Sequence, residues 1–100
     1  MSNLIMQFDL TVRNSKYREL LNILERELSR EIPFGCQERK VLQSLDDMNV
    51  FNFKLLWHDH SSMNTYLNSH DFKVLNGGLT TLCDKLEFEV FESHRIKMSV

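Results

Sequence analysis

The first dozen residues constrain the fold most strongly, because hydrophobic side chains recur there at every second position. The alternating positions between residues 4 and 12 are occupied by Leu4, Met6, Phe8, Leu10 and Val12. Successive side chains of a β-strand point to opposite sides, so a period of two predicts a strand with one strongly apolar face. The chain therefore begins with a strand.

A helical period follows this strand directly. Asn14 and Ser15 are residue types that cap helices, and the hydrophobic positions beyond them are spaced three and four residues apart. They are Tyr17, Leu20, Leu21, Leu24 and Leu28. We expect a helix from about residue 16 to residue 30, with the charged run 25–31, including Glu27, on its solvated face. Pro33 and Gly35 mark its end, since proline cannot continue the helical hydrogen bonds and glycine accepts turn geometry.

Two further strands are expected in the middle of the chain. Residues 37–45 alternate with mostly polar side chains, which indicates a strand that faces solvent or a partner on one side. Acidic and amide residues at 46–49 predict a turn. The next alternating set, Phe51, Phe53, Leu55 and Trp57, predicts a second strand that forms a hairpin with the first.

The last part of the chain predicts two helical segments and a final strand. Capping side chains at 58–62 precede a short helix over about 61–69, and a second helical run begins near Asp71. We interpret Gly77 and Gly78, inside that run, as permitting a close approach of the helix to the sheet. A metal-binding role for His58, Asp59 and His60 is the weaker alternative to capping, and no metal site is expected. Residues 86–91 alternate as a strand, and 94–100 form a tail.

The order strand, helix, strand, strand, helix, strand predicts an α+β, ferredoxin-like β-α-β-β-α-β sandwich over residues 1–93. Its four-stranded antiparallel sheet carries both helices on one face. The third strand also has apolar residues, Val50 and Leu56, for the opposite face. That face requires a second layer, most simply another copy of the chain, so we expect a homodimer.

Charge and composition exclude several classes of function. The chain has 12 Lys and Arg against 14 Asp and Glu, for a formal charge of −2, and neither sign forms a block that would bind phosphate backbones. A nucleic-acid partner is therefore not expected. With only short apolar stretches and no basic segment before an apolar run, neither a membrane partner nor a signal sequence is expected, and we predict a cytoplasmic protein. Cys36 and Cys83 lack metal or redox spacing, so burial as small hydrophobic residues is expected.

The segments 51–57 and 63–79 carry a resemblance to a known family. A strand that ends in Trp57 is followed by a helix with an aromatic residue before leucine, then serine, Phe72 and a Leu-Gly-rich segment. This pattern resembles the antibiotic biosynthesis monooxygenase family, especially its small quinol monooxygenase-like members. The resemblance implies a dimeric α/β barrel with one small, mostly apolar pocket per subunit between sheet and helices. Haem degradation is not implied, because haem-degrading relatives have histidine where this chain has Asn76.

The resemblance implies a small cofactor-independent monooxygenase, or a related enzyme, acting on a planar phenolic or quinol-type molecule. We expect the substrate to contact Trp57, Phe51, Phe53 and Phe72, for which core packing is the alternative. The expected catalytic residues are Tyr66, His70 and Asn52: Tyr66 donates a hydrogen bond, His70 exchanges a proton and Asn52 holds an oxyanion. Quinol-type relatives carry histidine at the position of Tyr66, so an identical acid/base mechanism is not implied. The alternative function is a non-catalytic dimeric ligand-binding or stress-response module of the same fold.

Overall fold

The structure, a computed structural model, describes residues 3–93, so the expected tail at 94–100 lies outside the described residues. Within that range the chain forms one antiparallel sheet, three α-helices and a short 3₁₀ turn, η1 (Asn14–Lys16). The elements in chain order are β1 (Asn3–Val12), α1 (Tyr17–Ser29), β2 (Cys36–Gln43), β3 (Val50–Trp57), α2 (His60–Leu67), α3 (His70–Leu82) and β4 (Cys83–Ser93). The expected order is confirmed, with the second helical region divided into α2 and α3.

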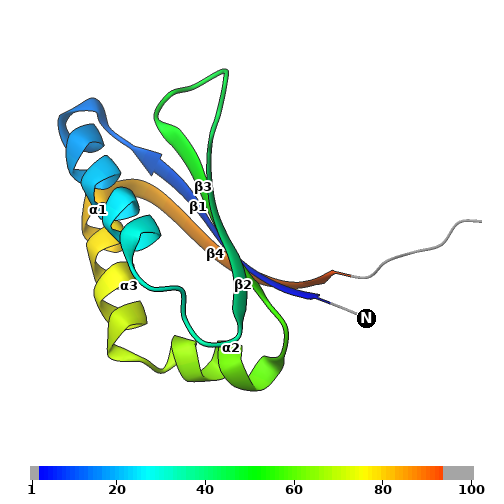
Figure 1. Cartoon of the computed structure of the whole chain (residues 1–100). Helices are drawn as coiled ribbons and strands as arrows, with labels where there is room; N and C mark the ends of the chain where they lie inside the picture. Colours follow the sequence, from blue (N-terminus) through cyan, green and yellow to red (C-terminus); the bar gives the residue numbers. More distant parts are fainter. Residues whose placement is uncertain (1–2, 94–100) are drawn as a thin grey trace, which may run out of the picture.

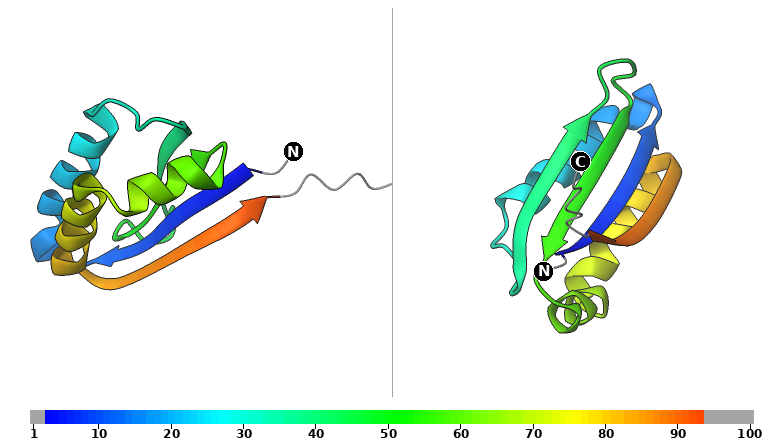
Figure 2. Two further views of the ribbon diagram at one scale, coloured as in Figure 1. Left: turned by 90° about the horizontal axis from the view of Figure 1, so that it is seen from below. Right: turned by 90° about the vertical axis from the view of Figure 1, so that its right-hand side faces the viewer.

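The four strands lie in the order β2-β3-β1-β4, and every neighbouring pair is antiparallel. The first strand is central, with Phe8 opposite Phe53 of β3 on one side and opposite Phe88 of β4 on the other. Figure 1 shows α1 and α3 side by side against one face of the sheet, with α2 at the end where β3 finishes. Figure 2 shows the opposite face without a covering helix. This is the expected ferredoxin-like arrangement.

Alternation along β1 and β3 determines which side chains form the core. The residues of β1 and β3 that face the helices are buried, and Met6, Phe8, Phe53 and Trp57 have no exposed surface. Leu20 and Leu24 of α1 and Leu75 and Leu79 of α3 pack against them. The residues between them on the strands are only half-buried, because they face the uncovered side.

The β2–β3 hairpin is confirmed, but β2 ends at Gln43 and not at residue 45 as expected. The Ser44 Oγ accepts hydrogen bonds from the backbone N–H groups of Asp46 and Asp47, which begins the turn early. Leu45 is consequently fully exposed at the tip of the hairpin.

Three expectations for the first helix were wrong. Neither Asn14 nor Ser15 caps α1, since Asn14 instead accepts a hydrogen bond from Asn49. Glu27 is buried, with 8% of its surface exposed, whereas Leu28 is 43% exposed. The cause is helical periodicity, since Glu27 lies seven residues after Leu20 and three after Leu24 and so shares their buried side. At the end of the helix the Arg39 guanidinium of β2 donates to the backbone carbonyls of Glu27, Leu28 and Arg30.

The two later helices begin at side-chain caps. Asp59 accepts a hydrogen bond from the Ser62 N–H at the start of α2, and Ser69 accepts one from the Phe72 N–H at the start of α3. The Gly77–Gly78 pair does not approach the sheet, which corrects the expectation above. A methyl group at Gly78 would lie 3.1 Å from Ile23 Cδ1 of α1, and nothing lies within 4 Å of the same position at Gly77. The close approach is between two helices. None of the helices in residues 3–93 has the length and hydrophobicity needed to span a membrane.

Candidate functional site

A pocket of about 330 Å³ lies where the loop between α1 and β2 meets α2 and the start of α3. Its apolar wall consists of Pro33, Phe34 and the ring of Tyr66. Four hydroxyl groups and two carboxylates supply the polar part, from Ser61, Ser62, Thr65, Ser69, Glu31 and Asp71. The pocket therefore combines an aromatic surface with many hydrogen-bond acceptors, and we call it the Tyr66 pocket.

A close backbone contact fixes the loop side of the Tyr66 pocket. Gly35 adopts a φ of +83°, and a methyl group added there would overlap Ser62 Cβ. The Gly35 carbonyl accepts a hydrogen bond from the His58 N–H at 3.2 Å, which joins the loop to the end of β3. Only glycine combines this left-handed φ with so close an approach. The local sequence Pro33-Phe34-Gly35 thus holds the loop against α2.

Ser69 fixes the helix side of the same pocket. Its hydroxyl donates to the Tyr66 carbonyl at 2.6 Å and accepts from the Phe72 N–H at 3.2 Å. One side chain therefore closes the last turn of α2 and caps the first turn of α3. Tyr66 is the last aromatic residue of α2, and this double contact sets the position of its backbone.

Tyr66 is buried at the bottom of the pocket, with 8% of its surface exposed. Its ring lies 5.3 Å from that of Trp57 and 5.6 Å from that of Phe72, measured between centroids. Burial, followed by the negative charges of Glu27 and Asp71, raises the pKa of the Tyr66 hydroxyl to about 12. The hydroxyl therefore remains protonated at neutral pH and acts as a hydrogen-bond donor.

The acidic side of the pocket is organised by Arg30. Its guanidinium contacts Asp71 Oδ1 at 2.8 Å and Glu27 Oε1 at 3.3 Å, and the hydrogen bond to Asp71 raises the pKa of Arg30 further above its ordinary value. Together with Glu31, the group contains three carboxylates and one guanidinium. The excess of negative charge favours ligands that donate hydrogen bonds over anionic ligands.

Trp57 and Phe72 lie behind Tyr66, in an aromatic cluster between sheet and helices. The rings of Phe8, Phe72 and Phe88 lie 4.8–6.1 Å apart between centroids and continue this cluster. None of the predicted substrate-contacting residues Trp57, Phe51, Phe53 and Phe72 is among the lining residues of the Tyr66 pocket. Trp57 Nε1 is nevertheless a buried donor without a hydrogen-bond partner in the described part of the chain.

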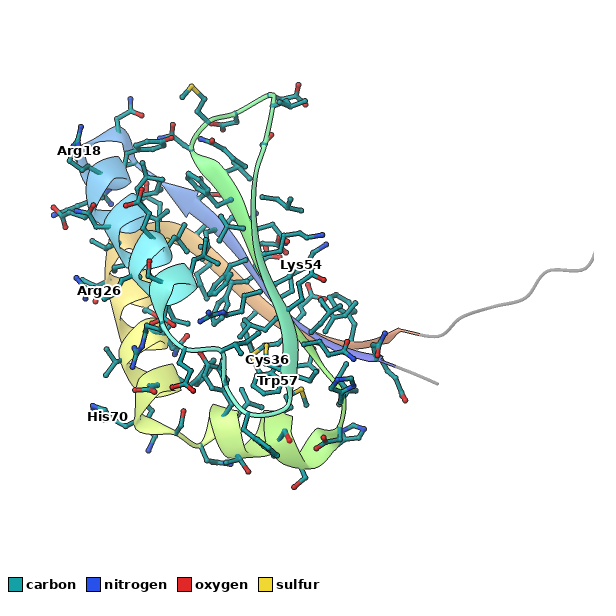
Figure 3. The ribbon with its side chains drawn as sticks, in the orientation of Figure 1. Arg18, Arg26, Cys36, Lys54, Trp57 and His70 are labelled. Atoms are coloured by element: carbon teal, nitrogen blue, oxygen red, sulfur yellow. The ribbon has the colours of Figure 1, made fainter. Side chains whose placement is uncertain are left out.

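Asn52 and His70, the other two predicted catalytic residues, lie elsewhere. Asn52 is on the uncovered face of the sheet, where its amide donates to Asp9 Oδ1 at 2.7 Å. His70 is exposed in the first turn of α3, and Figure 3 shows its side chain on the outside of that helix. The structure thus brings together Trp57, Tyr66 and Phe72, but neither Asn52 nor His70 joins them.

Sequence reasoning missed the charged residues around the pocket. Glu27 and Arg30 belong to a charged run that predicts a solvated face, although Glu27 lies seven residues after the buried Leu20 and therefore on the same side of the helix. The carboxylates of Asp9, Glu87 and Glu89 were missed as well, although their oxygens lie within 4.8 Å of one another on the uncovered face. That cluster depends on the register of β1 with β4, for which the sequence contains no direct signal.

The remaining candidate residues, in the 58–60 segment and at the two cysteines, take part in capping, hydrogen bonding or packing. Asp59 caps α2, and the Ser62 N–H lowers the pKa of its carboxyl group. His58 lies within hydrogen-bond distance of Gln37, so the 58–60 segment has contacts of its own. Cys36 is buried, as expected, and burial raises the pKa of its thiol. Cys83 is half-buried, and burial raises the pKa of its thiol to about 11.

Comparisons with known proteins identify the fold. No protein-family model matches the sequence, and no curated protein matches it significantly. A candidate antibiotic biosynthesis monooxygenase of Deinococcus radiodurans superimposes with a TM-score of 0.81 at 18% identity, over 97% of this chain and 98% of that one. The cofactor-independent oxygenase SnoaB of Streptomyces nogalater gives a TM-score of 0.78 at 18% identity, over 94% and 95% of the two chains.

A conserved protein of Methanosarcina mazei gives a TM-score of 0.73 at 24% identity, over 96% of this chain and 95% of that one. These likenesses extend over nearly the whole chain in each case. They confirm the ferredoxin-like fold expected for the single chain, and this chain therefore shares the fold of the antibiotic biosynthesis monooxygenases.

Proposed function

We propose that the chain is a small cofactor-independent oxygenase that acts on a planar phenolic or quinol-type molecule in the Tyr66 pocket. The observation that carries this proposal is the combination, in one pocket of about 330 Å³, of a neutral donor on Tyr66 with the carboxylates of Glu31 and Asp71. Pockets for small ligands begin at about 300 Å³. A phenol offers a flat ring to the apolar wall and a hydroxyl donor to a carboxylate. The shared fold with SnoaB supports the same reaction class.

The proposed reaction needs a proton acceptor and a donor at separate positions. Loss of the phenolic proton gives an electron-rich anion that reduces dioxygen directly, and Asp71 and Glu31 are the acceptors that the pocket offers. Tyr66 donates a hydrogen bond to the oxygen atoms on which negative charge develops. The substrate carbon is oxidised to a carbonyl, one atom of dioxygen enters the product and the other leaves as water. The proposal gives Asn52 and His70 no part in this step.

Oxygen consumption with a panel of quinols and anthrone-like phenols tests the proposal. We expect a protein-dependent rate with at least one compound, and a decrease of roughly a hundredfold in Tyr66→Phe, the effect typical of removing one donor to a developing oxyanion. Val74→Ala, at an exposed position of α3 outside the pocket, is the control and retains the rate. Absence of any protein-dependent rate across the panel contradicts the proposal.

A non-catalytic ligand-binding module is the second candidate, and the position of the predicted catalytic residues favours it. Of the three, only Tyr66 lines the pocket, and the Trp57 ring behind it is fully buried and packs against the Tyr66 ring. Titration calorimetry with the same panel separates the two functions. Heat of binding without oxygen consumption, lost in Tyr66→Phe, supports a module that binds but does not react.

The proposed assembly is a homodimer formed through the uncovered face of the sheet. One crosswise row of that face contains Leu56, Ile5 and Phe91, which pair in register across β3, β1 and β4. Ile5 and Leu56 are half-buried, and Phe91 is 41% exposed. A second copy would cover this row, and two-fold symmetry is the commonest closed arrangement.

A further inference from the structure

The polar wall of the Tyr66 pocket offers mainly hydrogen-bond acceptors, because three of its four serine and threonine hydroxyls already donate to the protein. The hydroxyls of Thr65 and Ser69 donate to backbone carbonyls of α2 at 3.0 and 2.6 Å. The Ser62 hydroxyl donates to a carboxylate oxygen of Asp59 at 3.2 Å. A hydroxyl group has a single hydrogen to donate, so these three groups can only accept from a ligand.

Two lining residues, Ser61 and Tyr66, keep a hydroxyl hydrogen for a ligand. Neither hydroxyl donates to an acceptor within residues 3–93. Tyr66 is more than nine-tenths buried, so its hydroxyl has lost most of its contact with water without gaining a protein partner. A buried polar group in this state gains most from a ligand that bonds to it. The pocket is therefore built to receive a molecule, and it offers few donors against many acceptors.

The charged residues of the lining are all negative. They are Glu31 and Asp71, and no lysine, arginine or histidine lines the pocket. Asp71 is paired with Arg30 at 2.8 Å, whereas Glu31 has no ion-pair partner in the described part of the chain. The starts of α2 and α3 would favour an anion, but Asp59 already caps α2 and Asp71 lies in the first turn of α3. The carboxylate that remains without a partner, Glu31, favours a cation.

We propose that the ligand of the Tyr66 pocket is an arylalkylamine, a phenol whose ring carries a protonated amine on a short alkyl chain. The proposal rests on the proposed function, whose pocket it uses, and adds the charge of the substrate. An ammonium group combines positive charge with three donors, which matches a wall of acceptors. Glu31 pairs with the ammonium group and leaves Asp71 to accept from the phenolic hydroxyl. The ring packs on the apolar wall, where Phe34 is 92% exposed and free to cover it.

Three phenols that differ only in the charge of one side chain test this preference. They are 4-hydroxyphenethylamine, 4-ethylphenol and 3-(4-hydroxyphenyl)propionate, which are positive, neutral and negative at neutral pH. We expect calorimetry at low salt to show the amine binding roughly tenfold more tightly than the propionate, with the neutral phenol between them, since Glu31 attracts one and repels the other at an exposed position. The difference should narrow as salt is added, because salt screens exposed charges.

Two variants separate the charge of Glu31 from the aromatic contact. Glu31→Gln should reduce the difference between the amine and the propionate by roughly threefold or more, since it removes the unpaired carboxylate. Glu25→Gln makes the same change at an exposed position of α1 outside the pocket, so it is the matched control and keeps the difference. Phe34→Ala should weaken all three phenols alike and leave their order unchanged. Thermal unfolding of each variant checks that it folds.

Binding and oxygen consumption are measured separately, so that the charge preference and the proposed reaction can fail independently. Propionate or neutral phenol bound as tightly as the amine, an unchanged difference in Glu31→Gln, or no binding of any of the three overturns the charge preference. Oxygen consumption is followed with the three hydroquinones that carry the same side chains. The expected order of binding without consumption contradicts the oxygenase and supports an amine-binding pocket. Consumption without a preference for the amine overturns the present inference alone.

Discussion

The two faces of the sheet are built from the same strands and have opposite properties. Along β1, Met6 and Phe8 point into the helix layer and have no exposed surface. Gln7 and Asp9, which alternate with them, face the open side. The closed face is packed with aromatic rings, and Trp57 Nε1 is its buried donor without a partner in the described part of the chain. The open face carries hydrogen-bonded amides, carboxylates and lysines around a few apolar side chains. The difference indicates that the closed face stabilises the protomer, whereas the open face is the surface through which we propose that two copies associate.

The largest expected effect concerns the closed face, at Phe8. This side chain is fully buried and its ring neighbours those of Phe53, Phe72 and Phe88. Phe8→Ala leaves a cavity among them, so we expect the free energy of unfolding to fall by about 3–5 kcal/mol. Chemical denaturation measures this change. Phe34→Ala is the control: Phe34 is 92% exposed, and its loss should change stability by no more than about 0.5 kcal/mol. Equal effects would show that the closed face is not the stabilising one.

The corresponding change on the open face is Leu56→Asp. Leu56 lies in the apolar row with Ile5, so a carboxylate there opposes association but leaves the helix-covered core intact. We expect the wild type to sediment near 24 kDa, twice the chain mass of 11.9 kDa, and Leu56→Asp to sediment as a monomer or to aggregate.

The hairpin tip supplies the control for this change. Leu45 is fully exposed and lies outside the face, so Leu45→Asp should sediment as the wild type does. A wild-type protein that remains monomeric at micromolar concentration would contradict the proposed role of the open face.

The strands could be predicted from the sequence because both β1 and β3 are amphipathic. Alternation at 4–12 and 51–57 specifies which side chains share a face, and those faces are the ones observed. The buried side of α1 was predicted incorrectly in its last turn, because the charge of Glu27 outweighed its helical spacing from Leu20 and Leu24, which places it on the buried side.

The site could be predicted only in part, for a physical reason. Local spacing places Tyr66 on a helix near Ser69. Strand alternation puts Asn52 on the face opposite to Phe51 and Phe53. Neither pattern shows where the packed helices leave a cavity. Contacts such as Arg30 with Asp71 join distant segments. The pocket depends on these contacts and on Gly35, which is why its acidic side was not foreseen.

The next prediction concerns Gly35, in the loop between α1 and β2 that forms one wall of the Tyr66 pocket. Gly35→Ala introduces a methyl group that overlaps Ser62 Cβ at a φ of +83°, so either the loop or α2 must move. We expect a loss of about 1–3 kcal/mol in the free energy of unfolding, as for other strained backbone positions. Ligand binding in the Tyr66 pocket should weaken as well, since Ser62 forms part of its wall. Unchanged stability together with unchanged binding would show that this contact does not shape the pocket.

Alkaline pH should weaken the closed face through Tyr66. Its pKa is raised from 10.0 to about 12 by burial, so folding favours the neutral phenol. The resulting contribution to stability is fully present below pH 10 and is lost as the pH rises through about 12. We expect the unfolding midpoint to fall over this range in the wild type, and to fall less in Tyr66→Phe. Cys83, whose pKa is about 11, contributes in both proteins and cancels in the comparison. Identical pH profiles would place Tyr66 in contact with solvent.

The smallest expected effect concerns two adjacent glycines of α3, one of which packs against α1 while the other faces open space. Gly77 and Gly78 are adjacent in α3, but only at Gly78 would an added methyl group meet another element, at 3.1 Å from Ile23 Cδ1. Alanine has a higher helix propensity than glycine, so Gly77→Ala should raise the free energy of unfolding by about 0.5–1 kcal/mol. In Gly78→Ala the Ile23 side chain must shift by a few tenths of an ångström, which offsets that gain, and we expect little net change. Denaturation of the two variants side by side measures the difference. A larger gain at Gly78 than at Gly77 would show that α1 and α3 are not closely packed at this point.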